Sequence, residues 1–219
     1  MNRSSRPARP KAQTPPKRRI LVFTEGEATE VIYLTHLYRQ NREKVAVVID
    51  TRHGTPLTIV RHAVAERETC VKDERRGRGT GFDSYWCVID VDEHPDLAEA
   101  RQVAQRHRIN LAVSNPCIEL WFVLHLEDQF AYIHRHEVQH RSAELFGFDK
   151  RPHTKTLVQL STLYPVAKAR AEALDLMHEQ NCSPEGSNPS TSIAPLVEAI
   201  MSLSRSDAAA VPRTGLEPV

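Results

Sequence analysis

The sequence has few cysteines and no closely spaced pair among them. The four stand far apart along the chain, at Cys70, Cys87, Cys117 and Cys182. A typical cysteine zinc site needs closely spaced ligand pairs, so this class of metal site is excluded. The first residues also lack the apolar stretch of a secretory signal peptide. These absences predict free, mostly buried thiols and a reducing, cytoplasmic compartment.

Long apolar runs and an excess of one charge are absent too. No run approaches the roughly 20 apolar residues that span a bilayer, so we expect a soluble body without membrane segments. The 29 Lys and Arg residues nearly cancel the 28 Asp and Glu residues. This balance excludes a globally basic coat for nucleic acid, so any contact with a polyanion must come from local basic clusters.

One local basic cluster lies at the N-terminus. Residues 1–19 contain seven Lys or Arg residues, four prolines and no acidic residue. This composition predicts a disordered basic arm over 1–18, which either touches a phosphate backbone or is only a solubilising tail. Residues 204–219 predict a second disordered tail. Between the tails we expect an α/β core over 19–128 and a helical extension packed on it over 129–203.

The apolar pattern between the tails alternates between two periods. Short continuous apolar runs, typical of buried strands, cover residues 20–24, 45–49, 85–89 and 111–113. Between these runs, apolar residues recur at helical spacing. This alternation predicts a four-stranded, mainly parallel sheet with helices on both faces. Past Asn115 the pattern predicts a C-terminal helical region, with helices over residues 116–126, 134–146, 155–181 and 193–203.

Acidic residues follow the first and third of these strands. Glu25 follows the first, and Asp90 and Asp92 follow the third. Alternate strand residues point the same way, so the aspartates should lie side by side, and a parallel sheet should bring Glu25 to the same edge. Repelling carboxylates need a cation, and oxygen ligands suit Mg²⁺ or Mn²⁺. Glu25 would hold a second ion or move a proton. Asp50, which ends the second strand, is better explained as a capping residue.

Glu119 is anomalous because it stands in a predicted helix that is apolar nearly all round. Burying a lone carboxylate is costly. With Asn115 as helix N-cap and Pro116 as the first helical residue, Glu119 falls one position past the capping-box place. It therefore either completes the metal cluster or pairs with a buried Arg or His. The residues expected to support the cluster are Gly26, which would allow a sharp turn, Glu27, Glu93, Ser114 and Asn115.

A different metal motif lies further along the chain. Residues 136–140 read HEVQH, the pattern of zinc peptidases, with His136 and His140 on one helix face and a glutamate able to activate water. The flanking residues are strongly polar, whereas a zinc helix usually has apolar surroundings, and no HxxGxxH-like extension follows. Zinc binding by His136 and His140 is therefore the minor alternative.

Three segments could contact nucleic acid. Arginines in the loop over residues 73–81 could bind phosphate, or the loop could be a solvated connector. A hydroxyl-rich segment at 188–192 precedes an apolar stripe and predicts a helix N-terminus that could receive an anion, with ordinary helix capping as the alternative. The candidate contact residues are Arg75, Arg76, Arg78, Lys155, Asn188, Ser190 and Thr191.

In combination these motifs resemble the RloB-like family. The resemblance covers about residues 19–203 and rests on four ordered segments: 20–30, 90–93, 114–121 and 188–191. It implies a Toprim-like fold, a small parallel sheet between helices. Toprim sites place one glutamate after the first strand and a DxD pair after the third, which here correspond to Glu25, Asp90 and Asp92. In that fold these acids serve magnesium-dependent phosphodiester chemistry.

The resemblance also implies a setting. RloB-like proteins are associated with restriction-linked and abortive-infection loci in bacteria, often beside an AAA-type ATPase. We therefore expect a divalent-metal-dependent endonuclease acting on DNA or RNA in anti-phage defence, restrained by that partner. The alternative is a non-catalytic subunit that binds nucleotide or nucleic acid and reports to the ATPase. Assembly into a homo-oligomer is compatible with either.

Overall fold

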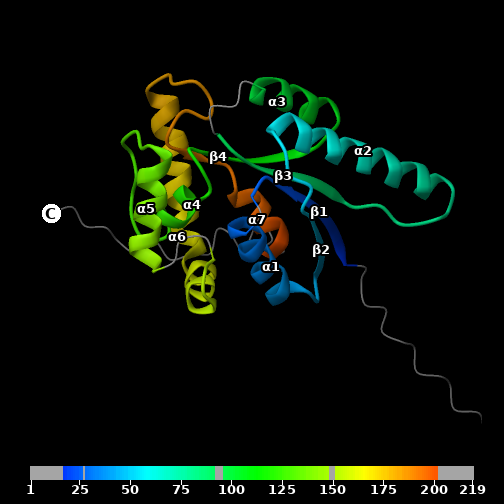
Figure 1. Cartoon of the computed structure of the whole chain (residues 1–219), viewed down its shortest axis with the longest axis horizontal. Coiled ribbons are helices and arrows are strands. Elements are labelled where there is room, and N and C mark those ends of the chain that lie inside the picture. The colour runs from blue at the N-terminus through cyan, green and yellow to red at the C-terminus, as the bar shows by residue number, and fades with distance from the viewer. Residues whose placement is uncertain (1–16, 27, 92–95, 148–150, 202–219) are drawn as a thin grey trace, which may run out of the picture.

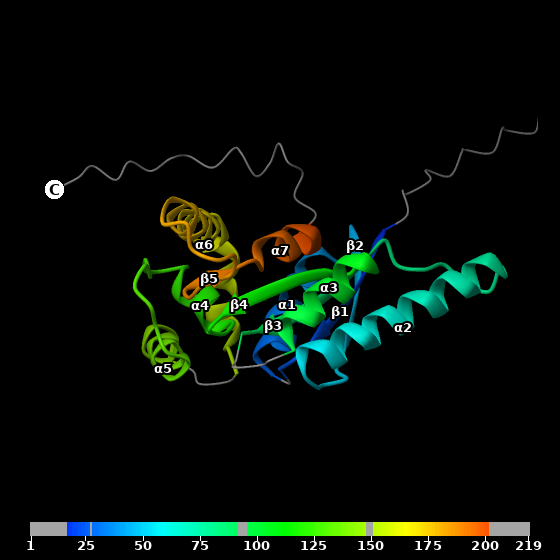
Figure 2. The same ribbon diagram turned by 90° about the horizontal axis from the view of Figure 1, so that it is seen from above.

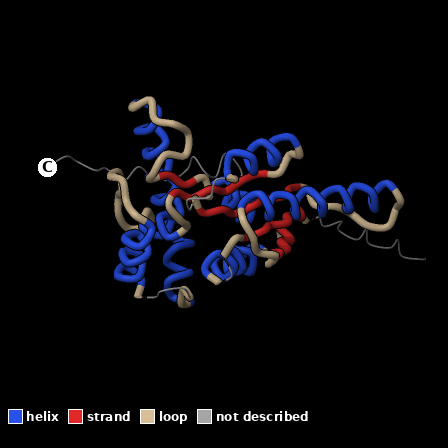
Figure 3. The backbone as a smooth tube through the Cα atoms, turned by 45° about the horizontal axis from the view of Figure 1, so that its top comes forward, coloured by secondary structure: helices blue, strands red, loops and turns tan. Residues whose placement is uncertain are grey.

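The protein has one mixed sheet between two layers of helices. The computed structural model describes residues 17–26, 28–91, 96–147 and 151–201. Its sheet has the strand order β2-β1-β3-β4-β5, in which β1 to β4 run parallel and β5 pairs antiparallel with β4. Figures 1 and 3 show the strands as one layer with helices on both sides. The strands are β1 (Arg18–Thr24), β2 (Val45–Asp50), β3 (Ser84–Asp90), β4 (Asn110–Asn115) and β5 (Ser190–Thr191).

Successive side chains along each strand point to opposite faces of the sheet, and this produces two separate apolar layers. In β1, Ile20 and Val22 join the core that contains α1 and α7, whereas Leu21 and Phe23 join the core that contains α2 and α3. Figure 2 shows the α7 side and the α2–α3 side on opposite faces. The helices are α1 (Thr29–Asn41), α2 (Pro56–Arg75), α3 (Leu97–Arg106), α4 (Glu119–Val123), α5 (Arg135–Phe146), α6 (Thr154–Gln180) and α7 (Ala194–Met201).

The predicted α/β, Toprim-like architecture with a parallel sheet and a C-terminal helical region is confirmed, with two local corrections. The sheet has a fifth strand, because Ser190–Thr191 pairs with the end of β4 instead of beginning a helix. The helix predicted over 116–126 is only the five-residue α4. Residues of α6 and α7 share one apolar core with β1.

The predicted tails lie mostly outside the described residues. Residues 1–16 and 202–219 are not described, but Arg18 and Arg19 belong to β1, so the arm ends at least one residue earlier than predicted. None of the helices in the described ranges is both long and apolar enough to cross a membrane. The parallel register places the ends of β1, β3 and β4 at one edge of the sheet, which positions the site below.

Candidate metal centre at the carboxyl edge of the sheet

Asp90 is the last residue of β3 and the centre of the site. Its side chain is buried, with the residue only 7% exposed. One carboxylate oxygen, Oδ1, accepts a hydrogen bond of 3.0 Å from the backbone N–H of Ile118, just before α4. The other, Oδ2, lies 3.6 Å from Nη2 of Arg135, the first residue of α5. Asp90 thus joins the sheet edge to the start of α4 and to the start of α5.

Glu25 reaches the same place from the neighbouring strand. Its backbone N–H donates to the carbonyl of Val88 at 3.2 Å, which extends the pairing of β1 with β3 by one residue. Its carboxylate Oε2 then accepts the N–H of Asp90, also at 3.2 Å. The backbone carbonyl of Glu25 lies 3.0 Å from Nδ1 of His53. The sequence prediction that Glu25 meets Asp90 at this edge agrees with the structure.

Glu119 joins them as the first residue of α4 and is only 8% exposed. Donor atoms of Asp90, Cys117 and Glu119 all lie within 4.8 Å of one another. The N-cap of α4 is Ile118, without a side-chain cap, so the predicted cap at Asn115 is wrong. Instead, the amide of Asn115 donates to the carbonyl of Gly186 at 2.8 Å.

Glu30 is a site residue that the sequence analysis did not single out. It lies in the first turn of α1 and is 5% exposed. An acidic residue in the first turn of a helix is common, because it interacts favourably with the positive end of the helix dipole. The signal was present nonetheless, since Glu30 has helical spacing with the buried residues Tyr33, Leu34 and Leu37 and so belongs to the buried face.

Gly26 makes room for that carboxylate. A Cβ at Gly26 would stand 2.1 Å from Oε2 of Glu30, far inside contact distance. Gly26 is not among the described glycines with positive φ, so the predicted reason for this glycine, a sharp turn, is replaced by close packing.

The carboxyl groups interact as like charges in a buried setting. Burial raises the pKa of Asp90 well above its usual range, and Glu30, Glu119 and Glu25 raise it further, while Arg135 opposes them. Burial likewise raises the pKa of Glu30, with Glu119 and Glu25 contributing. Such a cluster must either hold protons or bind a cation.

The donor set fits a hard divalent cation. Carboxylate oxygens of Asp90 and Glu119 are the ligands that Mg²⁺ and Mn²⁺ prefer, and those of Glu25 and Glu30 lie beside them. Burial, followed by the charges of Glu119 and Asp90, raises the pKa of Cys117. Two of the three donors in the group are carboxylates, which favours a hard, oxygen-bound ion.

Several predicted site residues lie outside the described residues, namely Glu27, Asp92 and Glu93. The second half of the DxD pair therefore stays a prediction. The pairing beside it continues past Asp90, because the N–H of Val91 donates to the carbonyl of Ser114 at 2.8 Å.

The hydroxyl-rich segments brace the edge of the sheet. Ser114 Oγ and Thr191 Oγ1 lie 2.8 Å apart between β4 and β5, and both residues are buried, as is Ser190. The amide of Asn188 exchanges two hydrogen bonds with the backbone of Ile133, at 3.0 and 2.9 Å. Ser190 and Thr191 also line a cavity of about 860 Å³, and their contact with nucleic acid stays a prediction. Ser114 and Asn115 pair with β5, and their supporting role in the site stays a prediction.

The comparison with known families is consistent with this geometry. The model of a family described as RloB-like protein matches residues 20–200. The chain belongs to the RloB-like family. No curated protein and no solved structure matches it. Every described residue of the acid cluster, from Glu25 to Glu119, lies inside the matched range.

The predicted arginine contacts lie away from the cluster. Helix α2 begins near the carboxyl edge and spans 20 residues, about 30 Å of helix. Figures 1 and 2 show its far end pointing away from α4 and α5. Arg75, Arg76 and Arg78 lie at that far end, exposed, and Arg78 pairs with Asp73 at 3.2 Å. Lys155 is exposed in the first turn of α6. Their contact with nucleic acid stays a prediction, and the arginine loop is not beside the acids.

The HEVQH helix is α5, and both of its histidines are exposed. His140 lies 3.3 Å from Glu144 within the same helix. Among the residues that the structure describes, the one potential metal-binding group of three or more side chains is that of Asp90, Cys117 and Glu119. Zinc binding by His136 and His140 has no assembled third ligand there.

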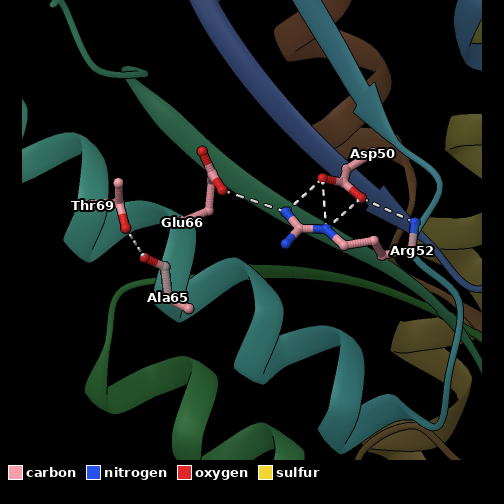
Figure 4. Close-up of polar contacts among 5 residues, drawn as sticks. All are labelled: Asp50, Arg52, Ala65, Glu66 and Thr69. Carbon is pink, nitrogen blue, oxygen red and sulfur yellow. Dashed lines mark hydrogen bonds and ion pairs between the residues drawn. The ribbon is translucent and has the colours of Figure 1, made fainter.

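Asp50 shows how a strand-end acid behaves outside the cluster. Figure 4 shows its carboxylate held by Arg52, with Nη2 of Arg52 at 2.6 Å from Oδ2 and a further contact to Glu66 at 3.4 Å. Hydrogen bonding to Arg52 lowers the pKa of Asp50. Asp50 has a structural role, although its partner is an arginine and not the helix end that the sequence suggested.

Replacing Gly26 with alanine should weaken metal binding. The added methyl group would displace the Glu30 carboxylate, and a change beside the ligands costs about tenfold in affinity. Calorimetric titration of the metal-free protein with MgCl₂ measures the effect. Gly79→Ala is the matched control, because a Cβ there meets nothing within 4 Å. Equal affinities for the two variants would contradict the role given to Gly26.

Proposed function

We propose that this protein is a divalent-metal-dependent nuclease that hydrolyses phosphodiester bonds in DNA or RNA. The observation that carries the proposal is the meeting of three buried or half-buried acids, Glu25, Asp90 and Glu119, at the carboxyl edge of a parallel sheet. Ligands in open parallel sheets bind at this edge. Family membership and the Toprim-like fold support the same chemistry.

In this proposal each residue has a distinct task. Asp90 and Glu119 would hold Mg²⁺ or Mn²⁺, together with Asp92, which lies outside the described residues. When bound, the ion would polarise the phosphate as a Lewis acid and lower the pKa of water. Glu25, whose carboxylate accepts the N–H of Asp90, would accept the proton of the attacking water, and Glu30 would add negative charge beside it.

Arg135 links the acids to their substrate. In the structure its guanidinium pairs with Asp90 at 3.6 Å. A cation placed there can stabilise negative charge that develops on a phosphate oxygen. With an ion bound by the acids, the Arg135 guanidinium would lie beside that ion and could contact the same phosphate.

The proposal includes a biological setting drawn from the family. The protein acts in bacterial anti-phage defence, and an AAA-type ATPase encoded nearby controls its activity. Such control explains why a nuclease would be harmless to its own cell until it is triggered. The ATPase is therefore part of the assay below.

The test measures cleavage of plasmid DNA and total cellular RNA with Mg²⁺, Mn²⁺ or chelator, by the protein alone and with its neighbouring ATPase. We expect cleavage that needs the metal and disappears in the double variant Asp90→Asn, Asp92→Asn. Asp50→Asn is the matched control, since Asp50 ends a strand but pairs with Arg52. Undiminished cleavage by the double variant would overturn the mechanism.

A different result would favour the non-catalytic alternative. If the complex binds nucleic acid and activates the ATPase without any cleavage, and does so without Glu25, the acids are a regulatory metal site. In that case neither wild type nor the double variant cleaves nucleic acid, and the double variant differs from wild type only in binding.

A further inference from the structure

A cavity lies on the side of α5 that does not face the acids. Its volume is about 430 Å³, within the usual range for small-ligand pockets. The wall on α5 comes from residues at helical spacing, which places them on one face of the helix. The lining residues are Gln129, Tyr132, Ile133, Glu137, His140, Arg141 and Glu144.

The cavity adjoins the candidate metal centre. Arg135, which pairs with Asp90, opens the helix whose other face lines the cavity. The cavity and the acids therefore contact different faces of the same helix. A strand with one phosphate at Asp90 would pass along α5 to place the base of a neighbouring nucleotide in the cavity.

Two exposed aromatic rings mark the loop beside the cavity. Tyr132 is 65% exposed and Phe130 is 49% exposed, so both rings are accessible to a ligand. The Tyr132 ring packs edge-on against His134, with centroids 5.0 Å apart. The next residue, Ile133, is buried, and its backbone N–H donates to Asn188 Oδ1 while its carbonyl accepts from the Asn188 amide. The loop therefore presents Tyr132 from a fixed position.

The charges around the cavity suit a base and not a phosphate. Arg141 pairs with both Glu127 and Glu144, and the carboxylate of Glu137 accepts the N–H of His134 at 3.1 Å. The basic groups are thus already neutralised by acids, which disfavours a bound phosphate. Mixed donors and acceptors beside an aromatic ring are the combination that recognises an unstacked base.

We propose that the cavity between the 129–133 loop and α5 binds an unpaired nucleobase of the substrate, stacked on Tyr132. This inference rests on the proposed function and adds the substrate class, single-stranded nucleic acid or an unpaired loop. A base inside a duplex cannot enter the cavity, because its faces are covered by its neighbours. Phe130 offers a second stacking surface at the same loop.

The test measures binding without cleavage. Fluorescence anisotropy in chelator compares a single-stranded oligonucleotide, as DNA and as RNA, with a duplex of the same sequence. We expect wild-type protein to prefer the single strands, and Tyr132→Ala to weaken that binding about tenfold, whereas Tyr132→Phe retains it. Leu176→Ala is the matched control, since Leu176 is 53% exposed on α6 but lies outside the cavity.

The outcomes separate this inference from the proposed function. Unchanged single-strand affinity in Tyr132→Ala, or a wild-type preference for duplex, overturns the base-binding cavity even if metal-dependent cleavage is found. Tyr132-dependent binding without any cleavage supports the cavity and removes the nuclease. Equal losses in Tyr132→Ala and Leu176→Ala would assign the effect to general apolar surface and overturn the inference.

Discussion

Asp90→Asn is expected to reduce metal-dependent cleavage by about 10²- to 10³-fold while making the metal-free protein more stable. The loss follows because the polarising ion contributes several kcal/mol to the transition state, and each 1.36 kcal/mol is about a factor of ten. The metal-free protein should gain stability because the asparagine side chain can still accept the N–H of Ile118. Unlike aspartate, it has no negative charge to be repelled by Glu30 and Glu119. The variant should therefore need a higher urea concentration to unfold than wild type at pH 8 in chelator.

The same raised pKa also predicts how stability changes with pH. The pKa of Asp90 is raised in the folded protein, so its contribution to stability is fully present below its unfolded pKa and is lost as pH rises through the folded value. Metal-free wild type should therefore lose stability from about pH 4 upward, and Asp90→Asn should lose less. Glu30, whose pKa is also raised, leaves part of the fall in the variant.

Urea unfolding at pH 5 and pH 8, with chelator or MgCl₂, measures both effects. Mg²⁺ should restore wild-type stability, by about 2.7 kcal/mol at one hundred times its Kd, and should not help the variant. Asp50→Asn is the control of opposite sign, because Arg52 lowers the pKa of Asp50 and its loss should cost up to about 1 kcal/mol. A metal-free Asp90→Asn protein less stable than wild type at pH 8 would contradict the charged cluster.

Trp121→Ala is expected to lower the free energy of unfolding by about 3–5 kcal/mol, the usual cost of emptying a buried aromatic position. Trp121 lies in α4 and is fully buried, and its indole N–H donates to the hydroxyl of Tyr33 at 3.0 Å. Its ring also packs against His125 and Tyr164, with centroids at 4.9 and 6.1 Å. The substitution therefore opens a cavity where α4, α1 and α6 meet.

The same substitution should reach the site, since Glu119 stands two residues earlier in the five-residue α4. Urea denaturation gives the stability change, and cleavage assayed where the variant is still folded gives the effect on the site. Trp86→Ala is the comparison, because Trp86 is only partly buried and should cost less. A loss below about 1 kcal/mol for Trp121→Ala would mean that α4 is not held by this packing.

Local features of the sequence were enough to predict the strands and the acids that follow them. Glu25 and Asp90 were found because each comes directly after an apolar run, and parallel strands end at a common edge. Strand β5 was missed because two polar residues carry no apolar period and pair only through contacts with β4. Glu30 was missed because a first-turn acid is common on exposed helices.

The sequence by itself determined the α/β order, the parallel sheet and the pair formed by Glu25 and Asp90, since these depend on periodicity and neighbours along the chain. Only the tertiary structure decided that Glu30 and Glu119 complete the cluster, that Arg135 faces Asp90, and that the arginine loop lies at the far end of α2. Those facts depend on how segments distant in the sequence pack together. Burial and charge interactions act through space, so they produce no periodic pattern in the local sequence.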